Sequence, residues 1–377
     1  MAGAIDAVTM PKWGLAMTEG RVVAWRRAGG EAIAAGAELV EIETSKITNG
    51  YEAPVSGVLR RCVARVGETL PVGGLIAVIA EAGVAESEVD AFVAEFNARR
   101  AAASPARAEA TPAAPQTLPA GGRRMRYLRM GAGAPVVLVH GFGGDLGSWL
   151  LTQPVLAERF EVLAPDLPGH GGSTKEAGDG SLDFLASALA DLLEALEMRR
   201  VHLVGHSLGG AVALKLALQR AELARSLTLI APLGLGPEID AGYIDGFIQA
   251  NRNRQLRPLV ERLFANPAMV GRKMVDEILD YKRLDGVAQA LKTIAGAVCN
   301  DGRQVVALRP RLAEIVVPVQ VIWGEADRII PAAHARDLPP SVAVHLMAGA
   351  GHMVQMEKAI EVNRIIERFI GNVATQP

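Results

Sequence analysis

The sequence predicts a multidomain protein in which a small all-β sandwich precedes a larger α/β domain. Residues 4–80 are rich in Val, Ile and Gly at short intervals, a pattern that indicates short strands joined by tight turns. Over residues 123–375, apolar strands alternate with helical stretches, which predicts a mainly parallel sheet with helices on both faces. The intervening residues 81–122 are expected to form one helix and then a linker.

The elements of this organisation follow from local patterns. The helix expected over about 85–103 carries one apolar stripe, formed by Val89, Phe92, Val93 and Phe96. Residues 103–119 contain four prolines and almost no large apolar side chain, so they predict a semi-extended linker without a core. The strands expected in the α/β domain are the apolar segments 136–140, 162–165, 201–205, 226–230, 319–323 and 342–347.

The overall composition is that of an ordinary globular protein. Half of the residues are hydrophobic, and the formal net charge of −2 provides no basic field for nucleic acid or an anionic membrane. No charge-free apolar run approaches the ~20 residues of a membrane helix, and the N-terminus lacks a signal-peptide pattern. Two distant cysteines, Cys62 and Cys299, give neither a disulfide framework nor a zinc spacing, which fits the cytoplasm.

The N-terminal domain contains an internal repeat with an offset of 37 residues. Glycines and one glutamate recur at this offset, which predicts two similar β-halves about a pseudo-two-fold axis. The segment Glu43-Thr44-Ser45-Lys46-Ile47 lies between the halves, where a hairpin tip is expected, and this would expose Lys46. The matching sets are Gly20, Gly30, Glu31, Gly36 and Gly57, Gly67, Glu68, Gly73.

Residues 10–20 and 43–47, together with Gly57, resemble the lipoyl domains of 2-oxo acid dehydrogenase-type complexes. The resemblance implies a lipoyl group joined to Lys46 by an amide bond. Two alternatives stay open, a biotinyl domain and an unmodified surface lysine. The lysine of a biotin carrier usually lies between methionines, whereas Ser45 and Ile47 flank this one.

The segment 201–210 carries a candidate nucleophile, Ser207. An apolar strand runs directly into Gly-His-Ser-Leu-Gly and then into an Ala/Leu-rich helix, which is the context of a nucleophile elbow. Gly205 and Gly209 lack the Cβ atoms that would clash in such a turn, and the helix N-terminus favours developing negative charge.

A serine needs a base to remove its proton, and the sequence offers one in the expected order. His352 follows the last apolar strand on a Gly-rich loop, and Asp327 follows the preceding strand. Asp327 is expected to orient the imidazole and stabilise its protonated form. The alternatives are a turn histidine for His352 and a helix N-cap for Asp327, with Glu325 as the substitute carboxylate.

Two backbone N–H groups are expected to form the oxyanion hole, those of Leu208 and Phe142, with Gly143 as the alternative to Phe142. Other polar residues near these segments are expected to hold loops or to pack, rather than to do chemistry. They are His140, Asp166, His170 and His206.

Residues 123–375 as a whole resemble the α/β-hydrolase superfamily, with a helical cap inserted at about 235–306. The stretch 251–273 in this cap holds six basic residues against one acid, Glu261. We interpret this stretch as a solvated helix face. The alternative is a binding site for a phosphate-bearing cosubstrate. The basic residues are Arg252, Arg254, Arg257, Arg262, Arg272 and Lys273.

The fusion of a carrier domain with a serine site is similar to the dihydrolipoamide acetyltransferases of acetoin dehydrogenase complexes. The resemblance implies acetyl transfer from S-acetyldihydrolipoyl-Lys46, through Ser207, to coenzyme A. It also implies a thiamine-diphosphate-dependent partner enzyme, a flavin-dependent dihydrolipoamide dehydrogenase and a homo-oligomeric core. The His-x-x-x-Asp-Gly signature of the usual acyltransferase components does not occur, and 81–122 contains no evident subunit-binding domain. An ester or thioester hydrolase carrying a lipoyl domain and a non-catalytic scaffold are the alternatives.

Overall fold

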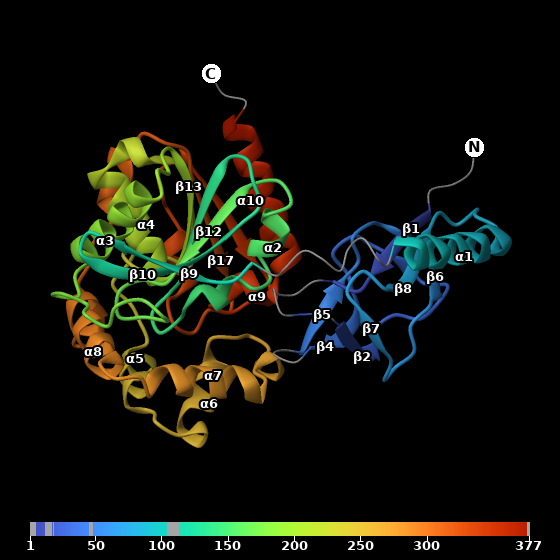
Figure 1. The fold of residues 1–377 in the computed structure, drawn as a ribbon, viewed down its shortest axis with the longest axis horizontal. Coiled ribbons are helices and arrows are strands. Elements are labelled where there is room, and N and C mark those ends of the chain that lie inside the picture. Colours follow the sequence, from blue (N-terminus) through green and yellow to red (C-terminus); the bar gives the residue numbers. More distant parts are fainter. Residues whose placement is uncertain (1–4, 12–16, 18, 45–47, 104–112, 375–377) are drawn as a thin grey trace. The chain divides into compact units, whose positions relative to one another are not determined.

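The computed structural model describes residues 5–11, 17, 19–44, 48–103 and 113–374. The chain divides into two units, Met1–Pro112 and Ala113–Pro377, each with its own core. Figure 1 shows the first unit in blue and cyan, and the second from green to red.

The first unit is a sandwich of two four-stranded antiparallel sheets, with strand orders β1-β8-β6-β3 and β5-β4-β2-β7. The internal repeat is confirmed, because β2, β3 and β4 recur 37 residues later as β6, β7 and β8. Each sheet contains strands from both halves, and the buried side chains between the sheets include Val22, Leu39, Ile42, Leu59 and Ile79. The strands are β1 (Ile5–Thr9), β2 (Glu19–Trp25), β3 (Ala32–Ile33), β4 (Glu38–Glu43), β5 (Thr48–Glu52), β6 (Gly57–Cys62), β7 (Thr69–Pro71) and β8 (Leu75–Ala80).

The repeated glycines are required for two different reasons. Gly20 and Gly57 lie in strands where a Cβ would clash with a neighbouring side chain, at 2.6 Å from Met10 Sδ and 2.7 Å from Ile79 Cγ2 respectively. The other four occupy turns with φ between +76° and +93°, a region that favours glycine. They are Gly30, Gly36, Gly67 and Gly73.

The hairpin of β4 and β5 is the one expected to carry the modified lysine. Glu43 at the end of β4 pairs with Thr48 at the start of β5. Lys46 belongs to the segment that connects these two strands, and it lies outside the described residues.

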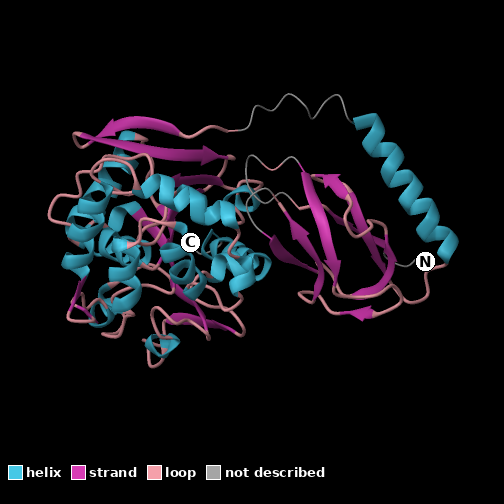
Figure 2. Ribbon diagram, turned by 90° about the horizontal axis from the view of Figure 1, so that it is seen from below, coloured by secondary structure: helices cyan, strands magenta, loops and turns pink. Residues whose placement is uncertain are grey.

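Helix α1 (Glu86–Ala103) packs on the outer face of the sheet that contains β8 (Figure 2). Its predicted stripe faces this sheet, with Val89 fully buried and Phe92, Val93 and Phe96 packed around it. At the start of the helix, Arg60 and Arg61 of β6 form ion pairs with Glu86. The helix is therefore packed as part of the first unit, although the sequence grouped it with the linker.

The second unit is built on an eight-stranded sheet with the order β18-β17-β14-β13-β11-β12-β10-β9. The six strands from β18 to β12 in this order are parallel, as predicted, whereas β10 pairs antiparallel with both β12 and β9. The strands are β9 (Gln116–Ala120), β10 (Arg123–Met130), β11 (Pro135–Val139), β12 (Glu161–Pro165), β13 (Val201–His206), β14 (Ala224–Ile230), β17 (Val319–Gly324) and β18 (Val342–Met347).

The hairpin of β9 and β10 was not predicted, and β9 begins inside the segment expected to be a linker. β10 contains four arginines, so it lacks the apolar run that marks the other strands. β9 contains Pro119, which a strand tolerates here because β9 lies at the edge of the sheet.

Helices cover both faces of this sheet (Figure 1), as the sequence predicted. Helices α3 and α4 pack together on one face, and α2 and α10 pack together on the other. The helices are α2 (Gln153–Leu156), α3 (Leu182–Ala195), α4 (Leu208–Gln219), α9 (Val354–Glu357) and α10 (Ala359–Ala374).

A helical cap is inserted between β14 and β17, as expected. It consists of four helices and a short hairpin of β15 and β16. Its elements are α5 (Ala241–Gln249), α6 (Asn253–Arg262), α7 (Arg272–Lys282), α8 (Val287–Val298), β15 (Cys299–Asn300) and β16 (Arg303–Gln304).

The separate cores predict that a cavity in one unit destabilises that unit alone. Leu59 in the first unit and Leu138 in the second are both fully buried. Leu59→Ala should cost the first unit about 2–5 kcal/mol, and Leu138→Ala should cost the second unit a similar amount. Hydrogen exchange of each variant should show faster exchange in residues 5–103 or 113–374 respectively. Accelerated exchange in both units from either variant would contradict separate cores.

Candidate active site

Ser207 occupies the sharp turn between β13 and α4, with φ +53° and ψ −117°. A non-glycine residue rarely adopts a positive φ, so this backbone is strained. The turn is held because Ser207 N–H donates to Ile230 O at 2.9 Å, and Ser207 O accepts from the N–H groups of Gly210 and Leu233. The predicted elbow is therefore present, with Ser207 at its apex.

The two glycines of the elbow motif are required by close packing. A Cβ on Gly205 would lie 2.4 Å from Gly209 O, and one on Gly209 would lie 2.2 Å from Val139 O. These neighbours are backbone atoms, which cannot move aside without displacing β11 or α4.

His352 and Asp327 form a buried pair at the same edge of the sheet. His352 Nδ1 lies 2.7 Å from Asp327 Oδ2, and the two side chains are 3% and 0% exposed. The other carboxylate oxygen of Asp327 accepts from the N–H groups of Ile329 and Ile330, at 2.8 and 3.0 Å. Glu325, the substitute carboxylate, is exposed, so the carboxylate against His352 is Asp327.

His206 connects the elbow to the His352 loop. Its Nε2 lies 3.0 Å from His352 O, and the two rings are 4.7 Å apart at their centroids. Burial, followed by the neighbouring His352, lowers the pKa of His206 well below its usual value, so the ring is neutral and Nε2–H donates. The sequence predicts only packing for His206, because a contact between residues 146 positions apart has no local signal.

The turn after β11 lies against the serine. Gly144 N–H donates to Gly141 O at 3.1 Å, which closes a turn with Phe142 and Gly143 at its centre. A Cβ on Gly141 would come within 3.1 Å of Ser207 Cβ. Leu208 is the first residue of α4, so its N–H has no acceptor within the helix. Both segments expected to supply oxyanion donors thus border Ser207.

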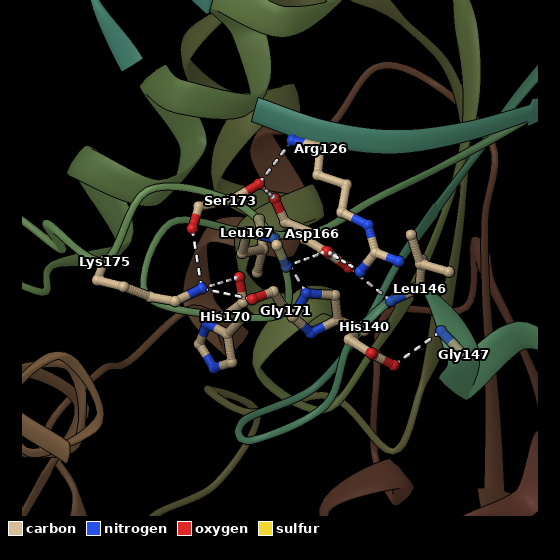
Figure 3. Close-up of polar contacts among 12 residues, drawn as sticks. Arg126, His140, Leu146, Gly147, Asp166, Leu167, His170, Gly171, Ser173 and Lys175 are labelled. Carbon is tan, nitrogen blue, oxygen red and sulfur yellow. Dashed lines mark hydrogen bonds and ion pairs between the residues drawn. The ribbon is translucent and has the colours of Figure 1, made fainter. Parts of the chain in front are cut away.

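A buried carboxylate, Asp166, holds the loops beside this turn (Figure 3). It accepts from Leu146 N–H at 2.8 Å and Gly172 N–H at 2.6 Å, and it pairs with Arg126 at 3.0 Å. His140 accepts from the N–H of Leu167 at 3.0 Å. Asp166 and His140 therefore hold loops, as the sequence predicted.

His170 lies in the same cluster, and its ring is 13° from parallel to that of Tyr281 in the cap, at 6.5 Å. Its Nδ1 lies 3.1 Å from Pro168 O. Its Nε2 is buried and has no partner among the described residues. Burial, followed by the neighbouring His140, lowers the pKa of His170 to about 3, so this ring is neutral at neutral pH.

The basic stretch of the cap is partly neutralised. Arg257 pairs with Glu261, Arg262 with Asp240, and Arg272 with Asp276. The remaining three cations of this stretch, Arg252, Arg254 and Lys273, are exposed. These pairs favour the interpretation as a solvated helix face.

The residues that the structure describes contain no cluster of three or more His, Cys, Asp or Glu able to hold a metal ion. None of their helices has the length and apolarity needed to span a membrane.

Comparisons with known proteins agree with this organisation. Residues 134–359 match the alpha/beta hydrolase fold family, and residues 6–79 match the biotin/lipoyl family described as biotin-requiring enzyme. The chain is 47% identical, over 97% of its length and 98% of the relative, to the dihydrolipoyllysine-residue acetyltransferase component of the acetoin cleaving system of Pseudomonas putida. It is 43% identical over the same shares to the protein of that description from Cupriavidus necator.

Solved structures of similar fold cover 67% to 77% of this chain. A meta-cleavage product hydrolase from Pseudomonas fluorescens superposes with a TM-score of 0.63 at 21% identity. The match covers 68% of this chain and 97% of the hydrolase. At this identity the likeness establishes the fold only.

The His352–Asp327 pair predicts a large effect of Asp327→Asn on hydrolysis of an activated ester such as p-nitrophenyl acetate. An amide would hold the imidazole in the wrong tautomer, so kcat should fall by up to about 10⁴-fold. Glu325→Gln, two residues away and exposed, is the matched control and should keep full activity. Equal losses in the two variants would rule out Asp327 as the orienting carboxylate.

The buried neutral His170 predicts acid destabilisation. The unfolded chain takes up a proton near pH 6.5, whereas folded His170 resists protonation until about pH 3. Stability should therefore fall as pH drops through this range, by up to about 1.4 kcal/mol per pH unit from this residue. Denaturant unfolding at pH 7 and pH 5 should show a smaller loss for His170→Gln than for the parent protein. An unchanged loss would mean that His170 is not a source of the acid sensitivity.

Proposed function

Because this chain belongs to the dihydrolipoyllysine-residue acetyltransferase components of acetoin-cleaving systems, within the alpha/beta hydrolase fold family, we propose that Ser207 is its acyl-transfer nucleophile. The reaction moves an acetyl group from S-acetyldihydrolipoyl-lysine to coenzyme A. The observation that carries the proposal is the buried His352–Asp327 pair beside the strained Ser207 elbow.

In the first half-reaction, Ser207 Oγ attacks the carbonyl carbon of the thioester donor. His352 Nε2 accepts the Oγ proton, and Asp327 stabilises the imidazolium through Nδ1–H. The N–H groups of Phe142 and Leu208 receive the negative charge on the carbonyl oxygen. His352 then returns the proton to the departing sulfur, which leaves an acetyl ester on Ser207.

In the second half-reaction, His352 accepts the proton of the coenzyme A thiol, whose sulfur attacks the acetyl ester. Collapse of the tetrahedral intermediate releases acetyl-coenzyme A, and His352 returns the proton to Ser207 Oγ. The neutral state of His206 supports this cycle, because a cation beside His352 would oppose formation of the imidazolium.

The lipoyl cofactor is assigned to Lys46, between the paired strands β4 and β5. Glu43 is exposed and Thr48 is half-exposed at the ends of these strands. Exposure of these flanking residues supports attachment of a carrier group between them. When bound, the lipoyl group would supply a thiol at the end of a flexible arm, and this thiol would carry the acetyl group. A tether to the same assembly raises its effective concentration at Ser207.

As a component of an acetoin-cleaving system, the chain works with other enzymes. We assign the loading of acetyl groups to a thiamine-diphosphate-dependent component and reoxidation of the dithiol to a flavin-dependent dihydrolipoamide dehydrogenase. A homo-oligomeric core would bring several carriers to each active site. The free thiols of Cys62 and Cys299 support a cytoplasmic location.

Ser207→Ala tests the acyl-enzyme. The parent protein, mixed with acetyl-dihydrolipoamide, should gain one acetyl group at Ser207 by intact mass and form acetyl-coenzyme A when coenzyme A is added. The variant should gain no acetyl group there and lose transfer by about 10⁴-fold or more. Ser181→Ala, which removes a hydroxyl at the start of α3, is the control and should transfer normally.

Two outcomes would contradict this mechanism. Full transfer by Ser207→Ala would mean that the thiol attacks the thioester directly, with His352 as base. Free acetate as the main product at ample coenzyme A would make the protein a thioester hydrolase.

A further inference from the structure

Glu357, at the end of α9, joins the His352 loop to the cap. Its Oε2 accepts from Gly351 N–H at 2.5 Å, and its Oε1 accepts from Asn266 N–H at 3.0 Å. Gly351 precedes His352, whereas Asn266 belongs to the connection between α6 and α7. One carboxylate therefore bonds two segments that are 85 residues or more apart in sequence.

Other contacts between the same two segments surround this carboxylate. Met353 N–H donates to Leu263 O at 3.0 Å, just beyond His352. A Cβ on Gly351 would lie 2.7 Å from Ala265 N and 2.8 Å from Leu263 O. The backbone on both sides of His352 is therefore packed directly against the cap.

These contacts complete the support of the His352 loop. Its imidazole is held by Asp327, and its carbonyl accepts from His206. The residue before it is held by Glu357, and the residue after it by the cap carbonyl of Leu263. Of these supports, the last two connect the loop to the cap.

The Glu357 carboxylate is held mainly by backbone donors. Burial raises its pKa, whereas the N–H groups of Asn266, Gly351 and Ala265, and the charge of Lys358, lower it. Both oxygens are used as acceptors. A glutamine has the same shape, but its NH₂ group would face a backbone N–H, where it cannot accept a hydrogen bond.

We propose that Glu357 is a positioning residue that aligns His352 through Gly351 and makes this alignment depend on the seating of the cap. The inference rests on the proposed role of His352 as the base. The cap borders the site, because Phe247 of α5 packs against Phe142 with ring centroids 6.0 Å apart. A substrate that changes the position of the α6–α7 connection would therefore move the base with it. Small misplacements of a catalytic group cost large factors in rate.

The test compares Glu357→Gln with Glu361→Gln, which changes an exposed glutamate in the first turn of α10. We expect Glu357→Gln to lower kcat by about 10- to 100-fold with acetyl-dihydrolipoamide and coenzyme A, while both KM values change less than about 3-fold. The downfield proton resonance of the His352 Nδ1–H should broaden or disappear in this variant. Glu361→Gln should match the parent protein in all three measurements.

Several results would overturn the proposal. One is a parent-like kcat in Glu357→Gln, which would reduce Glu357 to a space-filling side chain. A second is a lower kcat with an unchanged His352 resonance, because Glu357 would then not act through the position of His352. A third is failure of Glu357→Gln to fold, which would make Glu357 a general stabilising residue. Failure of the proposed function is distinguishable, because it would appear as full transfer by Ser207→Ala whatever Glu357→Gln does.

Discussion

The strained backbone of Ser207 is the constraint on which the rest of the second unit depends. A positive φ at a serine persists only where the surroundings leave no alternative, and here three backbone segments meet at the turn. Gly205 fits against Gly209, and Gly209 fits against the end of β11. The central position of β13 in the sheet brings the turn after β11, the Asp327 loop and the His352 loop to the same edge.

Buried and partly buried carboxylates organise the loops at this edge. Asp166 follows β12, Asp327 follows β17 and Glu357 ends α9, and each accepts at least two backbone N–H groups. A carboxylate suits this task because its two oxygens accept from several directions and need no donor of their own. Such bonds are stronger than those between neutral groups, so three side chains can fix loops that have little regular structure.

The parts that could be predicted from the sequence are those with local signals. The elbow, the repeated glycines and the order of Ser207, Asp327 and His352 all follow from short motifs placed after apolar strands. The contact of His206 with His352 and the bonds of Glu357 could not be predicted, because they join segments that are distant in sequence. β10 was missed because its arginines conceal the apolar alternation that marks a strand.

The separate cores of the two units bear on which residues must be precisely aligned for the proposed reaction. Each unit buries its own core, and the hydrogen bonds described for Ser207, Asp327 and His352 lie within the second unit. Under the proposed function, the tether supplies the donor at high effective concentration, so the site needs little affinity for the arm itself. Rate is then limited by how well Ser207 and His352 are aligned rather than by how tightly the donor binds. The hydrogen bonds made by the residues on both sides of His352 would hold it in this alignment.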